Sequence, residues 1–142
     1  MFKWWNMANL KQLRSLVADF EKRYRGASLE PFIYVEPYEL ECNKFWPEIM
    51  TTHRGVYGIL HNDELLYIGK VTGKNRVLCH RINDYFVIRS DFSYGGSKYN
   101  WSKDPTHVVA WGVPHDSFFE ASGLEDFLID KLQNELPDNT RK

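Results

Sequence analysis

The 142-residue sequence has few features of a protein held together by disulfides or structural metals. Its two cysteines, Cys42 and Cys79, are too few for a disulfide framework, and neither they nor the five histidines have the spacing of metal ligands. The first residues contain no continuous apolar stretch of signal-peptide length, and no run is long enough to span a membrane. These absences predict a cytoplasmic protein with no membrane association.

A strong net charge is also lacking. The net charge of −1 by itself argues against a nucleic-acid binder, but the charges are segregated along the chain. Residues 70–103 carry seven Lys or Arg against two Asp, and residues 1–27 carry six basic residues against two acidic ones. Acidic residues are in excess in 28–50 and 116–142. This pattern is compatible with one phosphate-facing surface and equally with an ordinary mixed surface.

The composition is that of a single globular domain with an unusual number of aromatic rings. Hydrophobic residues make up 43% of the chain and charged residues 26%, which is an ordinary mix. The aromatic share of 15% is high. Such a share indicates well-packed sheets or surfaces on which other rings can stack.

Hydrophobic periodicity and turn residues predict an α/β domain with an antiparallel hairpin. Residues 1–50 are interpreted as an N-terminal extension, with an amphipathic helix and a short strand, that packs on a domain of residues 51–142. The expected elements are helix 8–25, strand 32–36, an irregular segment 37–54, strands 55–61 and 64–70, helix 75–87, loop 89–104, strand 107–113, and a helix from a capping box at Ser117–Glu120 to about 133.

The hairpin has a distinctive sequence. Residues 55–69 read Gly-Val-Tyr-Gly-Ile-Leu-His-Asn-Asp-Glu-Leu-Leu-Tyr-Ile-Gly, two apolar runs that each carry a tyrosine and are joined by an Asn-Asp turn. Sheets collect tyrosine because it packs well there. The tyrosine pair alone therefore does not define a functional site.

Two charged residues lie on apolar helix faces. At about 100° per residue, Arg81 falls within the apolar arc of the helix after the hairpin, and Glu125 falls within that of the C-terminal helix. Burying an unpaired charge costs several kcal/mol. One interpretation is structural: an Arg81–Glu125 ion pair between the two helices, or charges at the edge of the arc that reach solvent. The other is an active site with an inward-facing guanidinium and carboxylate.

Four motifs, in order, resemble those of the GIY-YIG nuclease family. Gly55-Val-Tyr57 and Tyr67-Ile-Gly69 are similar to the two halves of its signature. Arg81-Ile-Asn-Asp-Tyr85-Phe86 resembles its arginine-bearing helix, and the segment from Glu125 to Leu132 resembles its glutamate helix. The resemblance extends over about residues 54–139.

The resemblance implies a fold and an activity. The fold would be a GIY-YIG-like layer, with a small central antiparallel sheet flanked by helices and preceded by the N-terminal helical extension. The activity would be that of a small metal-dependent endonuclease, a hydrolase that cuts phosphodiester bonds in DNA, with RNA not excluded. The chain would act as a monomer or a homodimer.

The resemblance also implies roles for the charged residues. Glu125 would hold one Mg²⁺ (or Mn²⁺), with phosphate oxygen and water completing the coordination shell. Arg81 would bind the scissile phosphate and offset the charge that develops on its oxygens.

Three tyrosines and a lysine complete the implied catalytic set. Tyr57 and Tyr67 would flank the attacking water, and either one could be the general base. A phenol with a pKa near 10 needs a nearby cation for this task, and Lys70 and the metal ion are the candidates. Tyr85 would support or contact the phosphate.

Four further residues are candidates for binding the substrate: Lys74, Arg76, His80 and Asn139. The pair Arg76 and His80 also imitates the Arg-to-His spacing of the family. Arg81 is preferred as the catalytic arginine because only Arg81 lies on the apolar side of its helix.

Two alternative functions stay open. The chain could have the nuclease fold without activity and serve as a nucleic-acid-binding module. It could also be a protein-interaction domain in which the aromatic segment 92–101 contacts a partner through Phe92, Tyr94, Tyr99 and Trp101. These rings could instead stack on bases.

Overall fold

The structure is a computed structural model that describes residues 7–26, 28–42 and 44–139. The helices are α1 (Leu10–Tyr24), α2 (Glu48–Thr52), α3 (Leu78–Asn83) and α4 (Glu120–Leu132), with 3₁₀ turns at Leu40–Cys42 and His115–Ser117. The strands are β1 (Ile33–Glu39), β2 (Gly55–His61), β3 (Glu64–Val71), β4 (Phe86–Ile88), β5 (Tyr94–Ser97) and β6 (His107–Gly112). Within these ranges, none of the helices is long and apolar enough to cross a membrane.

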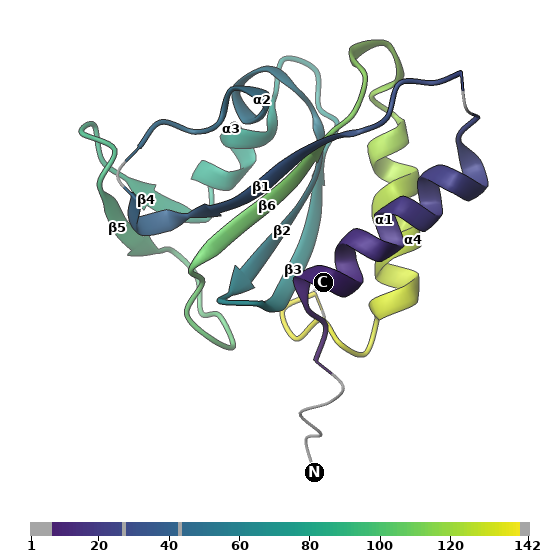
Figure 1. Cartoon of the computed structure of the whole chain (residues 1–142). Helices are drawn as coiled ribbons and strands as arrows, with labels where there is room; N and C mark the ends of the chain where they lie inside the picture. The colour runs from purple at the N-terminus through teal and green to yellow at the C-terminus, as the bar shows by residue number, and fades with distance from the viewer. Residues whose placement is uncertain (1–6, 27, 43, 140–142) are drawn as a thin grey trace.

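A four-stranded antiparallel sheet forms the centre of the fold (Figure 1). Its strand order is β1-β6-β2-β3, so β3 is an edge strand, and β4 and β5 form a separate two-stranded hairpin. The expected α/β class with a small antiparallel sheet is confirmed. β1, which belongs to the segment interpreted as an extension, pairs with β6 as the opposite edge of this sheet.

The expected hairpin is confirmed as β2 and β3. Its turn contains Asn62 with a left-handed φ of 53°, a conformation that asparagine adopts more readily than most residues. Tyr57 pairs with Gly69 across the two strands, and Ile59 pairs with Tyr67. Tyr67 therefore lies two residue positions along the hairpin from Tyr57.

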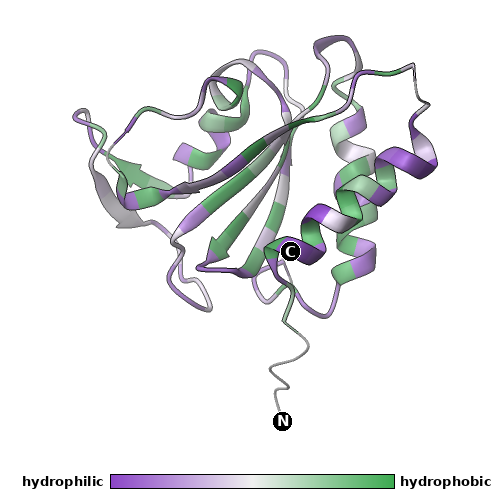
Figure 2. Ribbon diagram, viewed as in Figure 1, coloured by the Kyte–Doolittle hydropathy of each residue, from purple (hydrophilic) through white to green (hydrophobic). Residues whose placement is uncertain are grey.

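Each face of the sheet carries its own hydrophobic core. α1 and α4 cover one face, and α2, α3 and the β4–β5 hairpin lie on the other (Figure 1). The strands are predominantly hydrophobic, whereas the helices alternate hydrophobic and polar residues (Figure 2). The first core includes Leu13, Val17, Ile68, Leu124 and Leu128, and the second includes Tyr57, Leu78, Ile82, Tyr85 and Phe86.

Two expectations about the N-terminal half are wrong. The strand expected at 32–36 extends to Glu39 and includes Pro37. Proline lacks the N–H that a sheet needs, and the register with β6 is irregular between Val35 and Tyr38, where the proline is accommodated. α2 then forms within the segment that was expected to be irregular.

Two expectations about the segment after the hairpin are also wrong. The helix expected at 75–87 is confined to the six residues of α3, because Asn75 has a left-handed φ of 62° before it and Phe86 already belongs to β4. The loop expected at 89–104 contains β5, which pairs with β4. Of the aromatic residues in this segment, Tyr94 therefore lies on a strand, while Tyr99 and Trp101 follow that strand.

The start of α4 is stabilised differently from the expected capping box. α4 begins at Glu120, and the Ser117 hydroxyl donates to the Glu120 carboxylate at 2.6 Å instead of capping the helix. Glu120 also accepts from Arg25 Nε at 2.6 Å and from its Nη2 at 3.1 Å. Because the Arg25 side chain is only 4% exposed, this ion pair joins the end of α1 to the start of α4 away from water.

The Arg25–Glu120 pair predicts acid-sensitive stability. The hydrogen bond from Arg25 lowers the pKa of Glu120 although burial acts against it. The pair's contribution is therefore fully present above the unfolded-state pKa of about 4.3 and is lost as the pH falls through the lower folded-state pKa. We expect Glu120→Gln to reduce the free energy of unfolding at pH 7 by about 3 kcal/mol and to flatten its decline below pH 4. Urea unfolding at several pH values measures both effects.

The control is Asp126→Asn, because Asp126 is exposed on the same helix. This change should alter the unfolding free energy by less than about 0.5 kcal/mol at every pH. An equal loss in the two variants, or an unchanged acid response in Glu120→Gln, would contradict the role of the pair.

Candidate functional site

The Tyr57 ring lies across the glycine of the neighbouring strand. A Cβ atom on Gly69 would stand 2.3 Å from Tyr57 Oη and 2.4 Å from its Cζ, so no other residue fits at position 69 with the ring in place. Gly55 is restricted in the same way, since its Cβ would lie 1.9 Å from the main-chain oxygen of Trp111 on β6. The packing of the hairpin thus requires glycine at both positions 55 and 69.

Three tyrosine hydroxyls form a hydrogen-bonded chain that runs from Tyr57 through Tyr85 to Tyr67. The hydroxyls of Tyr57 and Tyr85 are 2.7 Å apart, and Tyr85 donates to Tyr67 at 3.4 Å. Tyr57 is 1% exposed and Tyr85 is 7% exposed, while Tyr67 is half-buried. Only the outermost member of the chain, Tyr67, has substantial access to solvent.

The surroundings of Tyr57 and Tyr67 favour the protonated forms of their hydroxyls. Burial raises the pKa of Tyr57 far above its ordinary value, and the neighbouring Tyr85 raises it further. Burial and the hydrogen bond with Tyr85 raise the pKa of Tyr67 to about 12. Arg81 lowers the pKa of both tyrosines in part. Tyr57 and Tyr67 are therefore neutral near pH 7.

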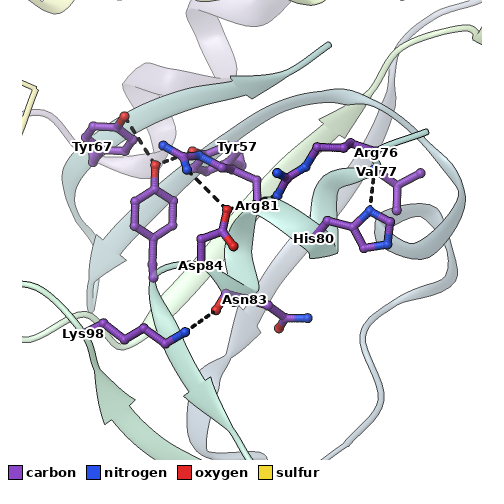
Figure 3. A network of polar contacts seen from close by, with 10 residues as sticks. Tyr57, Tyr67, Arg76, Val77, His80, Arg81, Asn83, Asp84 and Lys98 are labelled. Atoms are coloured by element: carbon purple, nitrogen blue, oxygen red, sulfur yellow. Dashed lines mark hydrogen bonds and ion pairs between the residues drawn. The ribbon is translucent and has the colours of Figure 1, made fainter. Parts of the chain in front are cut away.

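Arg81 reaches this group from α3. Its guanidinium carbon lies 4.9 Å from the centre of the Tyr85 ring, and its Nη1 pairs with Asp84 at 3.3 Å. Arg76 also pairs with Asp84, at 3.0 Å, so one carboxylate joins two arginines (Figure 3). The Arg81 side chain is 43% exposed. Among the described residues no ion pair joins Arg81 and Glu125, whereas the exposure of Arg81 fits the alternative in which a charge at the edge of the apolar arc reaches solvent.

Lys70 and Glu125 meet on the other face of the sheet. Lys70 Nζ donates to Ser122 Oγ at 3.1 Å and lies 3.8 Å from Glu125 Oε1. The Glu125 side chain is 16% exposed, compared with 37% for Lys70. Glu125 is therefore a largely buried carboxylate next to a cation at the inner surface of α4.

The edge strand β3 separates the two groups and also connects them. Tyr67 packs against the core on the α3 side, whereas Lys70, three residues further along β3, contacts α4. The Tyr67 hydroxyl nevertheless responds to both charges, since Arg81 lowers its pKa and Glu125 raises it. Tyr67 thus lies within electrostatic range of the guanidinium on one side and the carboxylate on the other.

The C-terminal segment binds along the outer edge of β3. The Asn139 side chain accepts from Ile68 N at 2.7 Å and donates to Ile68 O at 2.9 Å, while Asp138 N donates to Leu66 O. The Asp138 carboxylate accepts from Ser102 N and Ser102 Oγ, at 3.1 and 2.8 Å. Asn139, a predicted substrate-binding residue, therefore uses both polar side-chain atoms to hold the edge strand.

A cleft of about 300 Å³ opens at this edge. It is lined by Tyr67, Arg81, Tyr85, Tyr99, Trp101 and Asp138. Sequence reasoning named Tyr99 and Trp101 only as a possible partner-binding or base-stacking segment, and it did not name Asp138. The cluster of aromatic residues in 94–101 makes Tyr99 and Trp101 recognisable from the sequence. Asp138 is not recognisable in this way, because its place in the cleft depends on a contact between segments that are distant in the sequence.

The other predicted substrate-binding residues lie beside the cleft rather than in it. Lys74, Arg76 and His80 are exposed around the turn between β3 and α3, and none of the three lines the cleft. His80 Nδ1 accepts from the Val77 main-chain nitrogen at 3.2 Å, which satisfies a free N–H at the start of α3.

Glu125 is the one predicted metal ligand. Among the described residues, no three His, Cys, Asp or Glu side chains gather closely enough to hold a metal ion. The donor set still suits Mg²⁺, which commonly takes one or two carboxylates and completes its shell with water and substrate phosphate. Lys70 competes with such an ion for the Glu125 carboxylate.

Comparison of the chain with protein-family models, curated proteins and solved structures gives no match. The function of the chain must therefore be inferred from its motifs and from the geometry of the site.

The contact between Tyr57 and Gly69 predicts that even one methyl group at this position is damaging. We expect Gly69→Ala to lower the free energy of unfolding by roughly 1–3 kcal/mol, because the ring must leave its place in a packed core. Chemical denaturation measures the loss.

The matched control is Gly73→Ala in the exposed turn after β3, where the added Cβ would be 3.6 Å from its nearest neighbour on Arg76. This control should be neutral or slightly stabilising, by up to about 1 kcal/mol. Equal stability of the two alanine variants would show that the ring does not depend on the glycine.

Proposed function

We propose that this chain is a metal-dependent endonuclease of the GIY-YIG type that acts on DNA in the cytoplasm. The observation that carries the proposal is the position of Tyr67, at the mouth of a cleft and within electrostatic range of both Arg81 and Glu125. A cation that can bind phosphate and a carboxylate that can hold a metal ion, both near a phenol, suit the hydrolysis of a phosphodiester bond.

The fold supports the same proposal. The β2–β3 hairpin carries both halves of the signature, α3 carries the arginine, and α4 carries the glutamate. The two helices lie on opposite faces of the small sheet, next to its edge strand β3 (Figure 1). We include the GIY-YIG-like layer in the proposal on this basis.

Arg81 would bind the scissile phosphate. In hydrolysis, water adds to phosphorus and the bond to the 3′ oxygen breaks, which leaves a 5′-phosphate and a 3′-hydroxyl. The Arg81 guanidinium is close enough to solvent to exchange its partner Asp84 for a phosphate oxygen, and charge-assisted hydrogen bonds to phosphate are strong. Arg76, which shares Asp84, would then keep this carboxylate paired and so limit its repulsion of the phosphate.

Glu125 would hold the Mg²⁺ or Mn²⁺ ion, with Lys70 moving aside to Ser122, to which it already donates. When bound, the ion would supply positive charge to the leaving 3′ oxygen. The low exposure of Glu125 keeps its carboxylate from being fully hydrated, which strengthens its attraction for a cation.

Of the two signature tyrosines, Tyr67 is the one positioned to contact water and substrate. It lines the cleft, whereas Tyr57 is covered and bonds to Tyr85. With a pKa of about 12, Tyr67 would need the positive field of Arg81, which already lowers that pKa, to accept a proton. Tyr57 would hold Tyr85 and so fix the orientation of Tyr67.

The direct experiment is nicking of supercoiled plasmid in Mg²⁺. We expect the wild-type chain to convert plasmid to the nicked form, Arg81→Ala to be roughly 100- to 1,000-fold slower, and Glu125→Gln to fall to a similar or lower rate. The reason is that each change removes a charge that offsets negative charge in the transition state. Gel densitometry against time gives the rates.

The matched controls are Arg23→Ala, an exposed arginine on α1, and Asp126→Asn, the exposed neighbour of Glu125. Both should retain the wild-type rate. In the same assay Tyr67→Phe should lose more activity than Tyr57→Phe, because only Tyr67 lines the cleft. A wild type that does not nick, or Arg81 and Glu125 variants as active as their controls, would refute the proposal.

A second candidate is a nucleic-acid-binding module without activity. The ion pair of Lys70 with Glu125 and the raised pKa values of Tyr57 and Tyr67 favour it, because each opposes a catalytic role. Salt-sensitive DNA binding without cleavage in Mg²⁺ or Mn²⁺ would identify this function.

A further inference from the structure

The cleft beside Arg81 differs from an ordinary phosphate-binding surface because most of its wall is aromatic. Four of its six lining residues are Tyr67, Tyr85, Tyr99 and Trp101. A phosphate alone makes no use of such rings. A nucleobase, in contrast, gains about 1–3 kcal/mol when it stacks on an aromatic side chain.

The rings of this wall are fixed in position. The Trp101 ring meets the edges of Tyr67 and Tyr85 at centroid distances of 6.0 and 5.6 Å and stacks on Phe86 at 6.2 Å. Its main-chain neighbour Ser102 is held by the buried Asp138 carboxylate. The aromatic wall of the cleft is thus held at Trp101 by both hydrophobic packing and hydrogen bonds.

Tyr99 is the exposed member of the wall. It is 54% exposed, and its ring meets the edge of the Tyr85 ring at 5.9 Å and 69°. A large, exposed aromatic ring at the opening of a cleft is available for stacking without displacement of any core residue. Tyr99 is therefore the best-placed ring for the outer side of a stacked base.

Three basic side chains at or near the cleft, Arg81, Arg76 and Lys98, complement a nucleic-acid backbone. Arg81 forms part of the wall, Arg76 is joined to it through Asp84, and Lys98 precedes Tyr99 with its ammonium group on the Asn83 carbonyl at the end of α3 (Figure 3). A phosphate on Arg81 would place its attached nucleoside at the aromatic wall.

We infer that the cleft binds one unpaired nucleobase next to the phosphate held by Arg81, so that the preferred substrate is single-stranded DNA or an unpaired segment within a duplex. A volume of about 300 Å³ is at the lower end for small-molecule pockets and suits one base with part of its sugar. A base within a duplex can enter only after it has left its stack, which costs a few kcal/mol and therefore favours an unpaired base. This inference depends on the proposed function for the role of Arg81.

The test is fluorescence anisotropy with a labelled 12-nucleotide single strand and the blunt duplex of the same sequence, in EDTA so that no cleavage occurs. We expect wild type to bind the single strand more tightly than the duplex. Tyr99→Ala should weaken single-strand binding about 5- to 150-fold, the equivalent of one lost stack, with little effect on the duplex. Tyr99→Phe, which keeps the ring, should retain the wild-type affinity.

The control is Phe119→Ala, because Phe119 is a comparably exposed aromatic residue, 63% exposed, at the start of α4. It should leave single-strand binding unchanged. Thermal unfolding of each variant checks that the exposed ring is not needed for folding. The inference is overturned if Tyr99→Ala binds the single strand as wild type does, if it weakens both forms equally, or if wild type binds neither form, in which case the aromatic wall serves a protein partner.

Failure of this inference and failure of the proposed function are distinguishable. If the protein nicks plasmid and Tyr99→Ala binds the single strand as tightly as wild type does, the base-binding cleft is refuted and the proposed nuclease activity stands. Ring-dependent binding of the single strand without nicking in any metal would refute the nuclease and leave the cleft.

Discussion

The arrangement of the site depends on the close contact between Tyr57 and Gly69. The absence of a side chain on Gly69 lets the tyrosine ring lie flat across β3 and become completely buried. A buried hydroxyl must have a hydrogen-bond partner, and Tyr85 supplies it at 2.7 Å. The Arg81 guanidinium in turn lies over the Tyr85 ring, and the Tyr85 hydroxyl donates a hydrogen bond to Tyr67. Gly69 thus makes room for the ring whose hydroxyl holds Tyr85 beside Arg81 and Tyr67.

The second constraint is that β3 is an edge strand. An unpaired edge must be covered, and the C-terminal segment covers it through Asp138 and Asn139. The cover also brings Asp138 to Ser102 and so fixes the aromatic wall. Groups from both faces of a sheet can approach each other only at such an edge, which is why the arginine side and the carboxylate side come within range of Tyr67.

Much of the fold and of the candidate site was predictable from local sequence. The features that were not predictable depend on single-residue backbone conformations or on contacts between distant segments. The hairpin and α1 followed from strong periodicity, and the site residues Tyr57, Tyr67, Tyr85 and Arg81 followed from motif order. The short α3 did not, because a left-handed Asn75 ends the pattern. Asp138 was missed since its role depends on contacts with β3 and with Ser102, distant in sequence. The Arg81–Glu125 ion pair failed as an expectation because helical arcs do not specify which face of the sheet each helix covers.

In the proposed nuclease, Tyr67 stands between an arginine that binds phosphate and a carboxylate that binds a metal ion. Titration of the ¹⁵N-labelled protein with Mn²⁺, read as paramagnetic broadening of amide signals, tests the carboxylate side directly. We expect the signals of Glu125, Ser122 and Lys70 to broaden first, and we expect Glu125→Gln to abolish this effect while Asp126→Asn retains it. Broadening that begins at exposed acidic residues elsewhere, or that is unchanged in Glu125→Gln, would exclude Glu125 as the metal ligand.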